Sequence, residues 1–400
     1  MKIVQYLREK GVKRALTVLW QYKIELFLER VLLVFYKRRP LKNIIVLESH
    51  NDFDCNGGAF YDYLIKNELN KKYKIVWLVR RKYKVQLPYN VTTVPLNGPS
   101  FRKAYYMCTY KYMLFDCEGG RKTKSNQCLT YCSHGAGGLK ASKGKIILAD
   151  NIDYILMQSK QYMPIQAKQW SLTNKDPRFI YVGYPAHDIL LNEDGSSELK
   201  KLTAKKYKKT ILWMPTFRKG IAYQRNDSTK EQALGIPLIQ KLDEYNELND
   251  FLMKHDICLI IKLHPKQDIG SLKITNRSNI KVLTASTVKE KKIDNYRLMK
   301  SVDALVSDYS GAAYEFLQIN RPIAYVLDDM QDYKLGFVVD DIHSLIAGKE
   351  IYTLNDLQDF IKDIAQEKDP YRAKRQQIRN FIYNFHDTKS CERLAKILEL

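Results

Sequence analysis

The strongest constraint on the fold is an alternation of short apolar runs with helical stretches, which occurs twice along the chain. In the first half the apolar runs lie at residues 43–47, 73–79, 112–116, 154–157 and 179–182. The alternation restarts with runs at 210–214, 257–261, 304–306 and 323–326. Short apolar strands separated by helices indicate parallel sheets that are covered on both faces. We therefore predict an α/β fold of two doubly wound, Rossmann-type halves, with a ligand cleft between the carboxyl ends of their strands.

A Lys- and Ser-rich stretch at about 193–209 separates the two series and is typical of a linker. A chain of 400 residues has the length of two medium-sized domains. We predict four parts: a helical segment at 1–40, an N-terminal domain at 41–195, a C-terminal domain at 205–350, and helices at 351–400.

The charge balance points to a polyanionic partner. The chain has 66 Lys and Arg against 44 Asp and Glu, a net charge of +22. Such an excess suits a nucleic acid, an anionic membrane surface or a phosphorylated polymer. Hydrophobic residues make up 45% of the chain, which excludes a disordered protein. The cysteine count of 7 is odd, and no signal peptide is visible, so we expect reduced cysteines in a cytoplasmic protein.

The first forty residues are apolar but unsuited to crossing a membrane. Charged residues interrupt every window of transmembrane length, namely Lys23, Glu25, Glu29 and Arg30. At helical spacing one face collects Ile24, Phe27, Leu28, Val31 and Phe35, and a basic cluster follows at 37–39. This pattern predicts an amphipathic helix that lies on an anionic leaflet. The alternative is a terminal helix packed on the protein's own core.

Residues 131–140 contain the first candidate for catalysis. A strand-like run ends in His134, and Gly135, Gly137 and Lys140 follow closely. Histidine suits a general base near neutral pH, and glycines allow backbone N–H groups to approach a ligand. The alternatives are a structural strand-end turn, or a metal site that includes Cys128 and Cys132. No second ligand pair with zinc-type spacing supports the metal site.

Two further segments suit the binding of phosphate. Lys262 and His264 alternate at a predicted strand end, where two cationic donors fit a phosphate or diphosphate. In the second segment, Ser310 is placed to cap a helix after the strand at 304–306. A surface strand end and an ordinary capped helix remain the alternatives. The triplet at 52–54 matches the Asp-x-Asp metal motif of many glycosyltransferases, which any loop with two aspartates also gives.

Taken in order, these segments resemble the CDP-glycerol glycerophosphotransferase family of bacterial teichoic-acid and capsule polymerases and primases. The family's loop Trp-His-Gly-Thr-Pro-Leu-Lys corresponds to residues 133–140, where Gly-Ala-Gly-Gly follows the histidine. Its Pro-Thr-aromatic-Arg, Arg-x-His-Pro and Asp-Tyr-Ser-Ser motifs correspond to 215–218, 262–265 and 308–311. Further similarities lie at 48–49, 56–57, 320–323 and 328–333, so that the resemblance covers about residues 43–345.

The resemblance implies a GT-B-like fold and a set of site residues. By this resemblance His134 is the catalytic base, and His264 with Ser310 and Gly311 holds the diphosphate of a CDP-linked donor. The remaining implied donor residues are Arg218, Lys262 and Asp308, and Gly135, Gly137 and Lys140 are assigned to the loop or the acceptor. No cofactor is implied, and a need for divalent metal stays open.

The predicted function is transfer of an alditol phosphate, glycerol phosphate first, from CDP-glycerol or a related CDP-alditol to a hydroxyl acceptor, with release of CMP. We expect a polyanionic or lipid-linked acceptor and a peripheral enzyme on the cytoplasmic face of the membrane. The rival enzyme is a GT-B glycosyltransferase that uses a nucleotide sugar. A rival of another class is a basic membrane- or nucleic-acid-binding protein, although no nucleic-acid motif is present and we expect no such partner.

Overall fold

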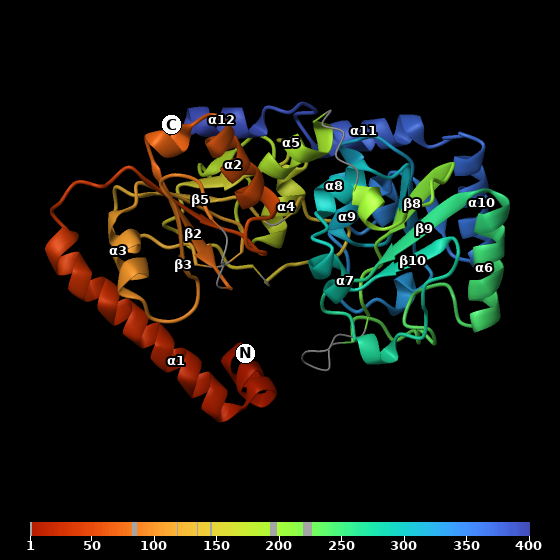
Figure 1. Ribbon diagram of the computed structural model, residues 1–400, viewed down its shortest axis with the longest axis horizontal. Coiled ribbons are helices and arrows are strands. Elements are labelled where there is room, and N and C mark those ends of the chain that lie inside the picture. Colours follow the sequence, from red (N-terminus) through yellow and green to blue (C-terminus); the bar gives the residue numbers. More distant parts are fainter. Residues whose placement is uncertain are drawn as a thin grey trace.

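Parallel strands form two sheets that lie side by side in the computed structural model (Figure 1). The structure describes residues 2–81, 86–117, 119–133, 135–144, 146–192, 198–218 and 226–400. Helices cover the sheets, and the polypeptide passes from the first half to the second after α5 (Pro185–Leu191). The last helices then return along both halves.

The first sheet has the strand order β3-β2-β1-β4-β5-β6-β7 in the described residues. Its strands are β1 (Ile44–Glu48), β2 (Lys74–Val79), β3 (Val91–Pro95), β4 (Tyr112–Phe115), β5 (Cys128–Tyr131), β6 (Tyr154–Leu156) and β7 (Phe179–Ile180). All the pairs are parallel, and β1 pairs with both β2 and β4. The helices of this half are α2 (Cys55–Lys66), α3 (Phe101–Thr109), α4 (Met163–Gln169) and α5. The strand order reverses between β1 and β4, which is where doubly wound folds bind ligands.

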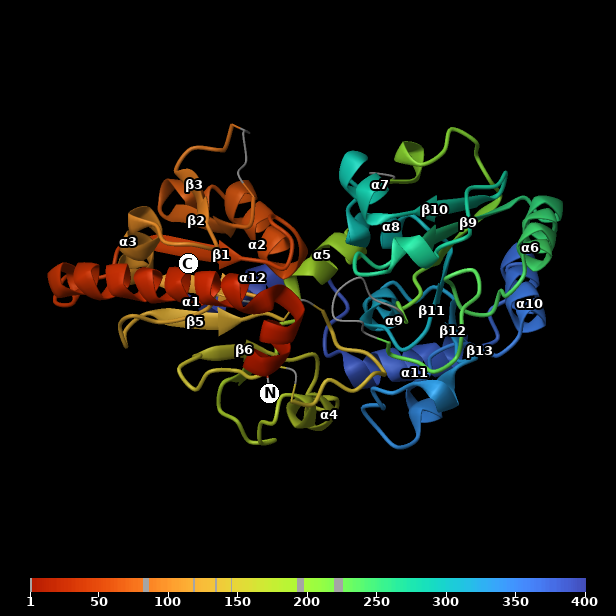
Figure 2. The ribbon, with the colours of Figure 1, turned by 90° about the horizontal axis from the view of Figure 1, so that it is seen from below.

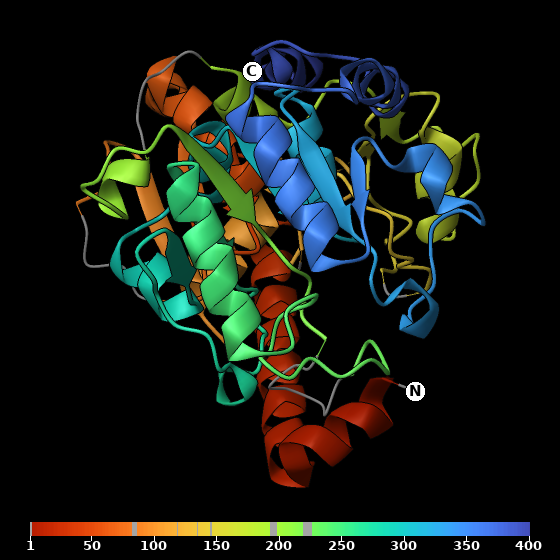
Figure 3. The ribbon, with the colours of Figure 1, turned by 90° about the vertical axis from the view of Figure 1, so that its right-hand side faces the viewer.

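The second sheet has the order β10-β9-β8-β11-β12-β13 in the described residues, again all parallel. Its strands are β8 (Lys209–Trp213), β9 (Ile257–Lys262), β10 (Ile280–Leu283), β11 (Ala304–Ser307), β12 (Ile323–Val326) and β13 (Lys349–Ile351). Its helices are α6 (Leu242–Lys254), α7 (Ala285–Glu290), α8 (Asn295–Lys300), α9 (Gly311–Leu317) and α10 (Leu354–Ala365). Figure 3 shows α6 and α10 side by side over one face of this sheet. The predicted pair of Rossmann-type halves is confirmed.

The C-terminal helices connect the two halves. They are α11 (Arg372–Ile382) and α12 (Ser390–Ile397), and α12 packs against α2 and α5 of the first half. Asp188 of α5 accepts hydrogen bonds from the backbone N–H groups of Ser390 and Cys391, both at 2.9 Å. Short 3-10 helices lie at Leu69–Lys71, Glu198–Lys201, Ile269–Ser271, Met330–Asp332 and Ile342–Leu345. All seven cysteines lie in the described residues and carry free thiols.

The N-terminal helix α1 (Lys2–Tyr36) lies along the first half and packs against α3 (Figure 2). Its Glu25 and Glu29 are buried and face the protein, where Glu25 pairs with Lys103 at 2.6 Å and both carboxylates pair with Arg121. The single apolar face predicted for this helix is not confirmed. Phe27 is 62% exposed, as is Phe35, whereas Ile24, Leu28 and Val31 are half-buried on the protein side. No described helix combines the length and the apolar character needed to cross a membrane.

Candidate active site

The glycine-rich loop after β5 reaches from the first half onto the second. The Lys140 N–H donates to the Tyr309 carbonyl at 3.2 Å, and Lys140 forms an antiparallel bridge with Phe337. The Val338 N–H donates to the Leu139 carbonyl at 2.9 Å. The loop is therefore part of the contact between the halves, at the carboxyl end of β5.

His134, the predicted base, lies outside the described residues, but its neighbours are placed. The Asn56 side-chain amide donates to the carbonyls of Cys132 and Ser133 at 3.1 and 2.8 Å, and its oxygen accepts the Ala186 N–H at 3.0 Å. Ser133 adopts a left-handed conformation with φ of 57°. Asn56 of α2 thus fixes the end of β5 where the loop begins.

Glycines allow this loop to touch the start of α9. A Cβ atom on Gly138 would lie 2.8 Å from the Gly311 nitrogen, and one on Gly311 would collide with the Gly137 carbonyl. Ser310 caps α9 by accepting the Ala312 N–H at 3.3 Å. The sequence-predicted residues Gly137, Ser310 and Gly311 are therefore neighbours, and Gly135 lies beside Glu315 of α9. In this arrangement Gly137 and Gly311 are required for backbone packing, whatever ligand binds nearby.

Basic groups from both halves surround His264. Burial lowers the pKa of His264 to about 3, and the charges of Lys140, Lys266, Lys262 and His50 add to that effect. The His264 Nδ1 atom accepts the Lys266 N–H at 3.1 Å, and its ring packs on Phe217 with centroids 4.7 Å apart. Because Nδ1 accepts a hydrogen bond, the neutral ring carries its proton on Nε2 and can donate it to an anion.

Lys262 adds a buried cation beside this ring. Its side chain is 6% exposed, and burial lowers its pKa while Asp54, across from it in the first half, raises it. A cationic amine held in a low-dielectric site binds an anion more strongly than one in water. Lys140, Lys262 and His264 therefore form, with His50 and Lys266, a basic cluster suited to a diphosphate.

Arg218 and Asp308 meet in a different, closed network. The Arg218 guanidinium pairs with Asp308 at 3.0 Å and with Asp329 at 2.6 Å, and it is 1% exposed. It lies 5.3 Å from the ring centroids of both Tyr309 and Tyr333. Burial raises the pKa of Asp329, but the hydrogen bonds and charge of Arg218 outweigh this and hold it below its usual value. Two carboxylates therefore occupy the guanidinium in this structure, and the contact of Arg218 with the donor stays a prediction.

Both aspartates of the Asp-x-Asp triplet accept hydrogen bonds from nearby backbone N–H groups. Asp52 accepts the N–H groups of Arg80 and Arg81, and Asp54 accepts the N–H of Cys55 at 2.7 Å and so caps α2. Among the described residues no group of three or more histidines, cysteines or acids is arranged to hold a metal ion.

Sequence reasoning missed several residues of this region. His50 and Lys266 join the basic cluster, and Glu315 bonds the glycine-rich loop through the Ala136 N–H at 2.6 Å. His50 follows a strand that was predicted, so its place at the carboxyl edge could have been inferred. Glu315 lies in a helix of the other half, and no local pattern relates it to the loop.

Comparison with known proteins decides the family. Residues 31–400 match the family described as CDP-Glycerol:Poly(glycerophosphate) glycerophosphotransferase. The chain belongs to this family. The resemblance inferred from the sequence motifs is thereby confirmed, and with it the class of transferase enzymes.

Characterised relatives of this family member act in teichoic acid synthesis. It is 24% identical to the teichoic acid poly(glycerol phosphate) polymerase of Bacillus spizizenii, over 75% of this chain and 78% of that protein. It is 26% identical to the teichoic acid glycerol-phosphate primase of Bacillus subtilis, over 62% of this chain and 57% of that protein. It is 25% identical to the teichoic acid ribitol-phosphate polymerase TarL of Staphylococcus aureus, over 60% of this chain and 40% of that protein. The match thus spans 40% to 78% of the length of these relatives.

The solved structure of the wall teichoic acid polymerase TagF has the same fold. Its TM-score is 0.70 at 17% identity, and the match covers 95% of this chain and 97% of that one. The GT-B-like architecture expected for the family is therefore confirmed.

Proposed function

We propose that this family member transfers an alditol phosphate, glycerol phosphate first, from a CDP-linked donor to an acceptor hydroxyl. The observation that carries the proposal is the basic cluster around His264, in which Lys140 of the first half joins Lys262 of the second. This cluster suits the diphosphate of the donor, and the family and its teichoic-acid relatives support the choice of CDP-glycerol.

In the proposed reaction His134 takes the proton of the acceptor hydroxyl as its oxygen attacks the phosphorus that bears the alditol. The new oxygen–phosphorus bond forms while the bond from that phosphorus to the bridging oxygen breaks, and CMP leaves. The His264 Nε2–H and the Lys262 ammonium stabilise the charge that develops on CMP. Phosphoryl transfer depends mainly on such positioning and electrostatic stabilisation. Arg218, Asp308 and Asp329 join the loops that follow β8, β11 and β12 in the second half.

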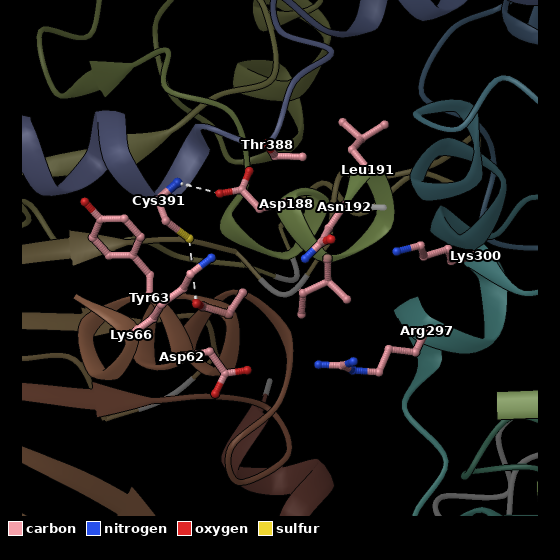
Figure 4. Close-up of a pocket in the computed structure, with 12 residues that line it drawn as sticks. Asp62, Tyr63, Lys66, Asp188, Leu191, Asn192, Arg297, Lys300, Thr388 and Cys391 are labelled. Carbon is pink, nitrogen blue, oxygen red and sulfur yellow. Dashed lines mark hydrogen bonds between the residues drawn. The ribbon is translucent and has the colours of Figure 1, made fainter. Parts of the chain in front are cut away.

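A cavity between the halves supplies a place for the acceptor. It has a volume of about 510 Å³ and lies between α2, α5, α8 and α12. In Figure 4 Arg297 points from α8 toward Asp62 of α2, and Lys300 points toward Asn192. Lys66, Arg297 and Lys300 line this cavity, and these cations suit a phosphate-bearing acceptor chain.

Charge reversal in this cavity tests the acceptor site. We expect Lys300→Glu to raise the acceptor KM about tenfold, the scale of one lost charge-assisted contact, and to leave the donor KM unchanged. Lys362→Glu, on the exposed face of α10, is the matched control. An unchanged acceptor KM in Lys300→Glu, or an equal rise in both KM values, would remove the acceptor from this cavity.

We propose further that α1 attaches the enzyme to the cytoplasmic face of the membrane. Exposed apolar side chains on this helix include Leu16, Leu19, Trp20, Phe27, Val34 and Phe35. The basic residues at 37–39 follow directly. Apolar side chains combined with basic ones are typical of helices that lie on an anionic leaflet.

The proposed activity is tested by nucleotide release. The purified protein is incubated with CDP-glycerol, CDP-ribitol and a nucleotide sugar, each with poly(glycerol phosphate) and lipid-linked acceptors, and the released nucleotides are separated. We expect CMP, dependent on both a CDP-alditol and an acceptor. Release of a nucleoside diphosphate from the nucleotide sugar would instead support a glycosyltransferase. Retention on RNA without any turnover would support a binding protein.

A further inference from the structure

A buried chain of hydrogen bonds joins the glycine-rich loop to both halves. His187 of α5 is 1% exposed, and its Nε2 atom lies 2.6 Å from Glu315 Oε2. The other oxygen of Glu315 accepts the Ala136 N–H at 2.6 Å. On the opposite side of the same residue, the Ala136 carbonyl accepts a hydrogen bond from the Gln158 amide, also at 2.6 Å. The backbone of Ala136 is therefore held from the second half by Glu315 and from the first half by Gln158.

The hydrogen-bond partners of His187 define which of its ring nitrogens carries the proton. The Gln318 amide nitrogen donates to the Phe385 carbonyl at 3.1 Å, which fixes the orientation of that amide. The same nitrogen lies 3.1 Å from His187 Nδ1, so Nδ1 is an acceptor. The ring proton is consequently on Nε2 and is donated to Glu315. On the other side of the amide, the Gln318 oxygen lies 3.1 Å from His386 Nδ1 and accepts its proton.

The surroundings of His187 leave its ring little freedom. Its ring packs edge-on against Tyr184 and Tyr383, with centroid distances of 5.4 and 5.1 Å. The Tyr383 hydroxyl in turn donates to the Tyr314 carbonyl of α9 at 2.9 Å. The ring is thus fixed by α5, by α9 and by the chain that returns to α12. A fixed donor holds the Glu315 carboxylate in one orientation toward Ala136.

The position of Ala136 affects both ends of the loop that contains it. Residue 134 lies two positions before it, and Gly137 and Gly138 touch the start of α9 immediately after it. Lys140, which contributes to the charge around His264, follows on the same segment. A shift of the Ala136 backbone would therefore move the predicted base relative to the basic cluster.

We propose that His187 and Glu315 are positioning residues of the transfer reaction, which hold the glycine-rich loop against the second half. This inference rests on the proposed function for its kinetic consequence, but the holding of the loop is a separate, measurable property. His187 acts on the loop through Glu315, and neither side chain is required to touch the substrate. A misplacement of about 1 Å at a reacting group costs about a hundredfold in rate.

The test compares His187→Ala with His187→Gln, whose side-chain amide can still donate to Glu315. We expect His187→Ala to lower kcat by about ten- to a hundredfold, with donor KM unchanged, and His187→Gln to restore most of the loss. The matched control is Gln127→Ala. Gln127 is about as buried as His187, but it lies at the amino end of β5, at the opposite end of the strands from the site. Gln127→Ala is expected to lower the Tm without lowering kcat.

Amide hydrogen exchange supplies a readout that needs no activity. We expect peptides that cover 132–141 to exchange faster in His187→Ala and in Glu315→Ala than in wild type, while peptides of β1 and β9 do not change. Unchanged exchange in that loop would overturn the proposal, as would a kcat loss that Gln127→Ala reproduces at equal Tm. Faster exchange in a protein whose wild type releases no CMP would uphold the holding role and reject the proposed function alone.

Discussion

At the scale of single residues, His264 is suited to bind an anion in its neutral form. Its Nδ1 atom is occupied by the Lys266 N–H, and burial together with four basic neighbours keeps the ring neutral. A neutral ring that presents Nε2–H to an anion needs no proton uptake to bind phosphate. Lys262, the more buried of the two donors, supplies the charge that the ring lacks.

His264→Ala should impair handling of the donor. A hydrogen bond to a charged group contributes about 1.5–3 kcal/mol, so we expect a ten- to hundredfold loss in kcat/KM for the CDP-alditol, with a smaller loss in Lys262→Ala. His264→Gln keeps an amide donor and should lose less than His264→Ala. Steady-state kinetics with varied donor measure this. If His264→Ala retains normal donor affinity and turnover, this residue is not in the site.

The depressed pKa of His264 also predicts a dependence of stability on pH. The unfolded chain takes up a proton near pH 6.5, whereas the folded protein resists it until about pH 3. Stability is therefore lost as pH falls below about 6.5, by up to about 1.4 kcal/mol per pH unit. We expect the Tm of wild type to fall more steeply than that of His264→Gln between pH 7 and pH 5. Parallel Tm curves for the two proteins would contradict the buried, neutral state of the ring.

At the scale of elements, α1 differs most from what its sequence predicts. The four charges in its centre argue correctly against a transmembrane helix, but two of them do not face solvent. Glu25 and Glu29 meet Arg121, a residue more than 90 positions further along the chain. A pattern of charges within one helix contains no information about such a distant partner, so the single apolar face predicted for this helix is not confirmed.

The same ion pairs determine how membrane attachment is tested. Deleting residues 1–40 would leave Lys103, which is 2% exposed, without its carboxylate partner. Triple substitution of Trp20, Phe27 and Phe35 by Glu leaves Glu25 and Glu29 in place. We expect this variant to lose sedimentation with anionic vesicles and to keep its activity on short soluble acceptors.

The matched control for α1 uses exposed apolar residues elsewhere. Tyr89 and Ile147 are 76% and 79% exposed and lie outside α1. Substituting both by Glu should leave vesicle binding unchanged. Equal sedimentation of the α1 variant and wild type would show that this helix does not attach the protein to membranes.

At the scale of the whole molecule, the halves were predictable and their contact was not. Runs such as 257–261 are apolar because β9 is buried on both faces, so strands of this kind are visible in the sequence. The strands β3, β10 and β13 were not predicted, because they include partly exposed residues and lack a continuous apolar run. The site motifs were visible because each follows a strand at the carboxyl edge. The contact between halves depends on pairs such as Ala136 with Glu315 and His187 with Glu315, which are 179 and 128 residues apart. Arg218 was found by its motif, but its carboxylate partner Asp329 was apparent only from the fold.

At this scale both halves contribute to the proposed transfer, in which the alditol phosphate moves to the acceptor and not the alditol alone. The direct measurement uses CDP-glycerol labelled with ³²P at the phosphorus next to glycerol, with wild type and with His134→Ala. We predict that wild type moves the label into the acceptor and releases unlabelled CMP, and that His134→Ala slows this by about 10²- to 10⁴-fold while still binding the donor. Label that remains on the nucleotide as CDP, or transfer at the wild-type rate in His134→Ala, would contradict the account.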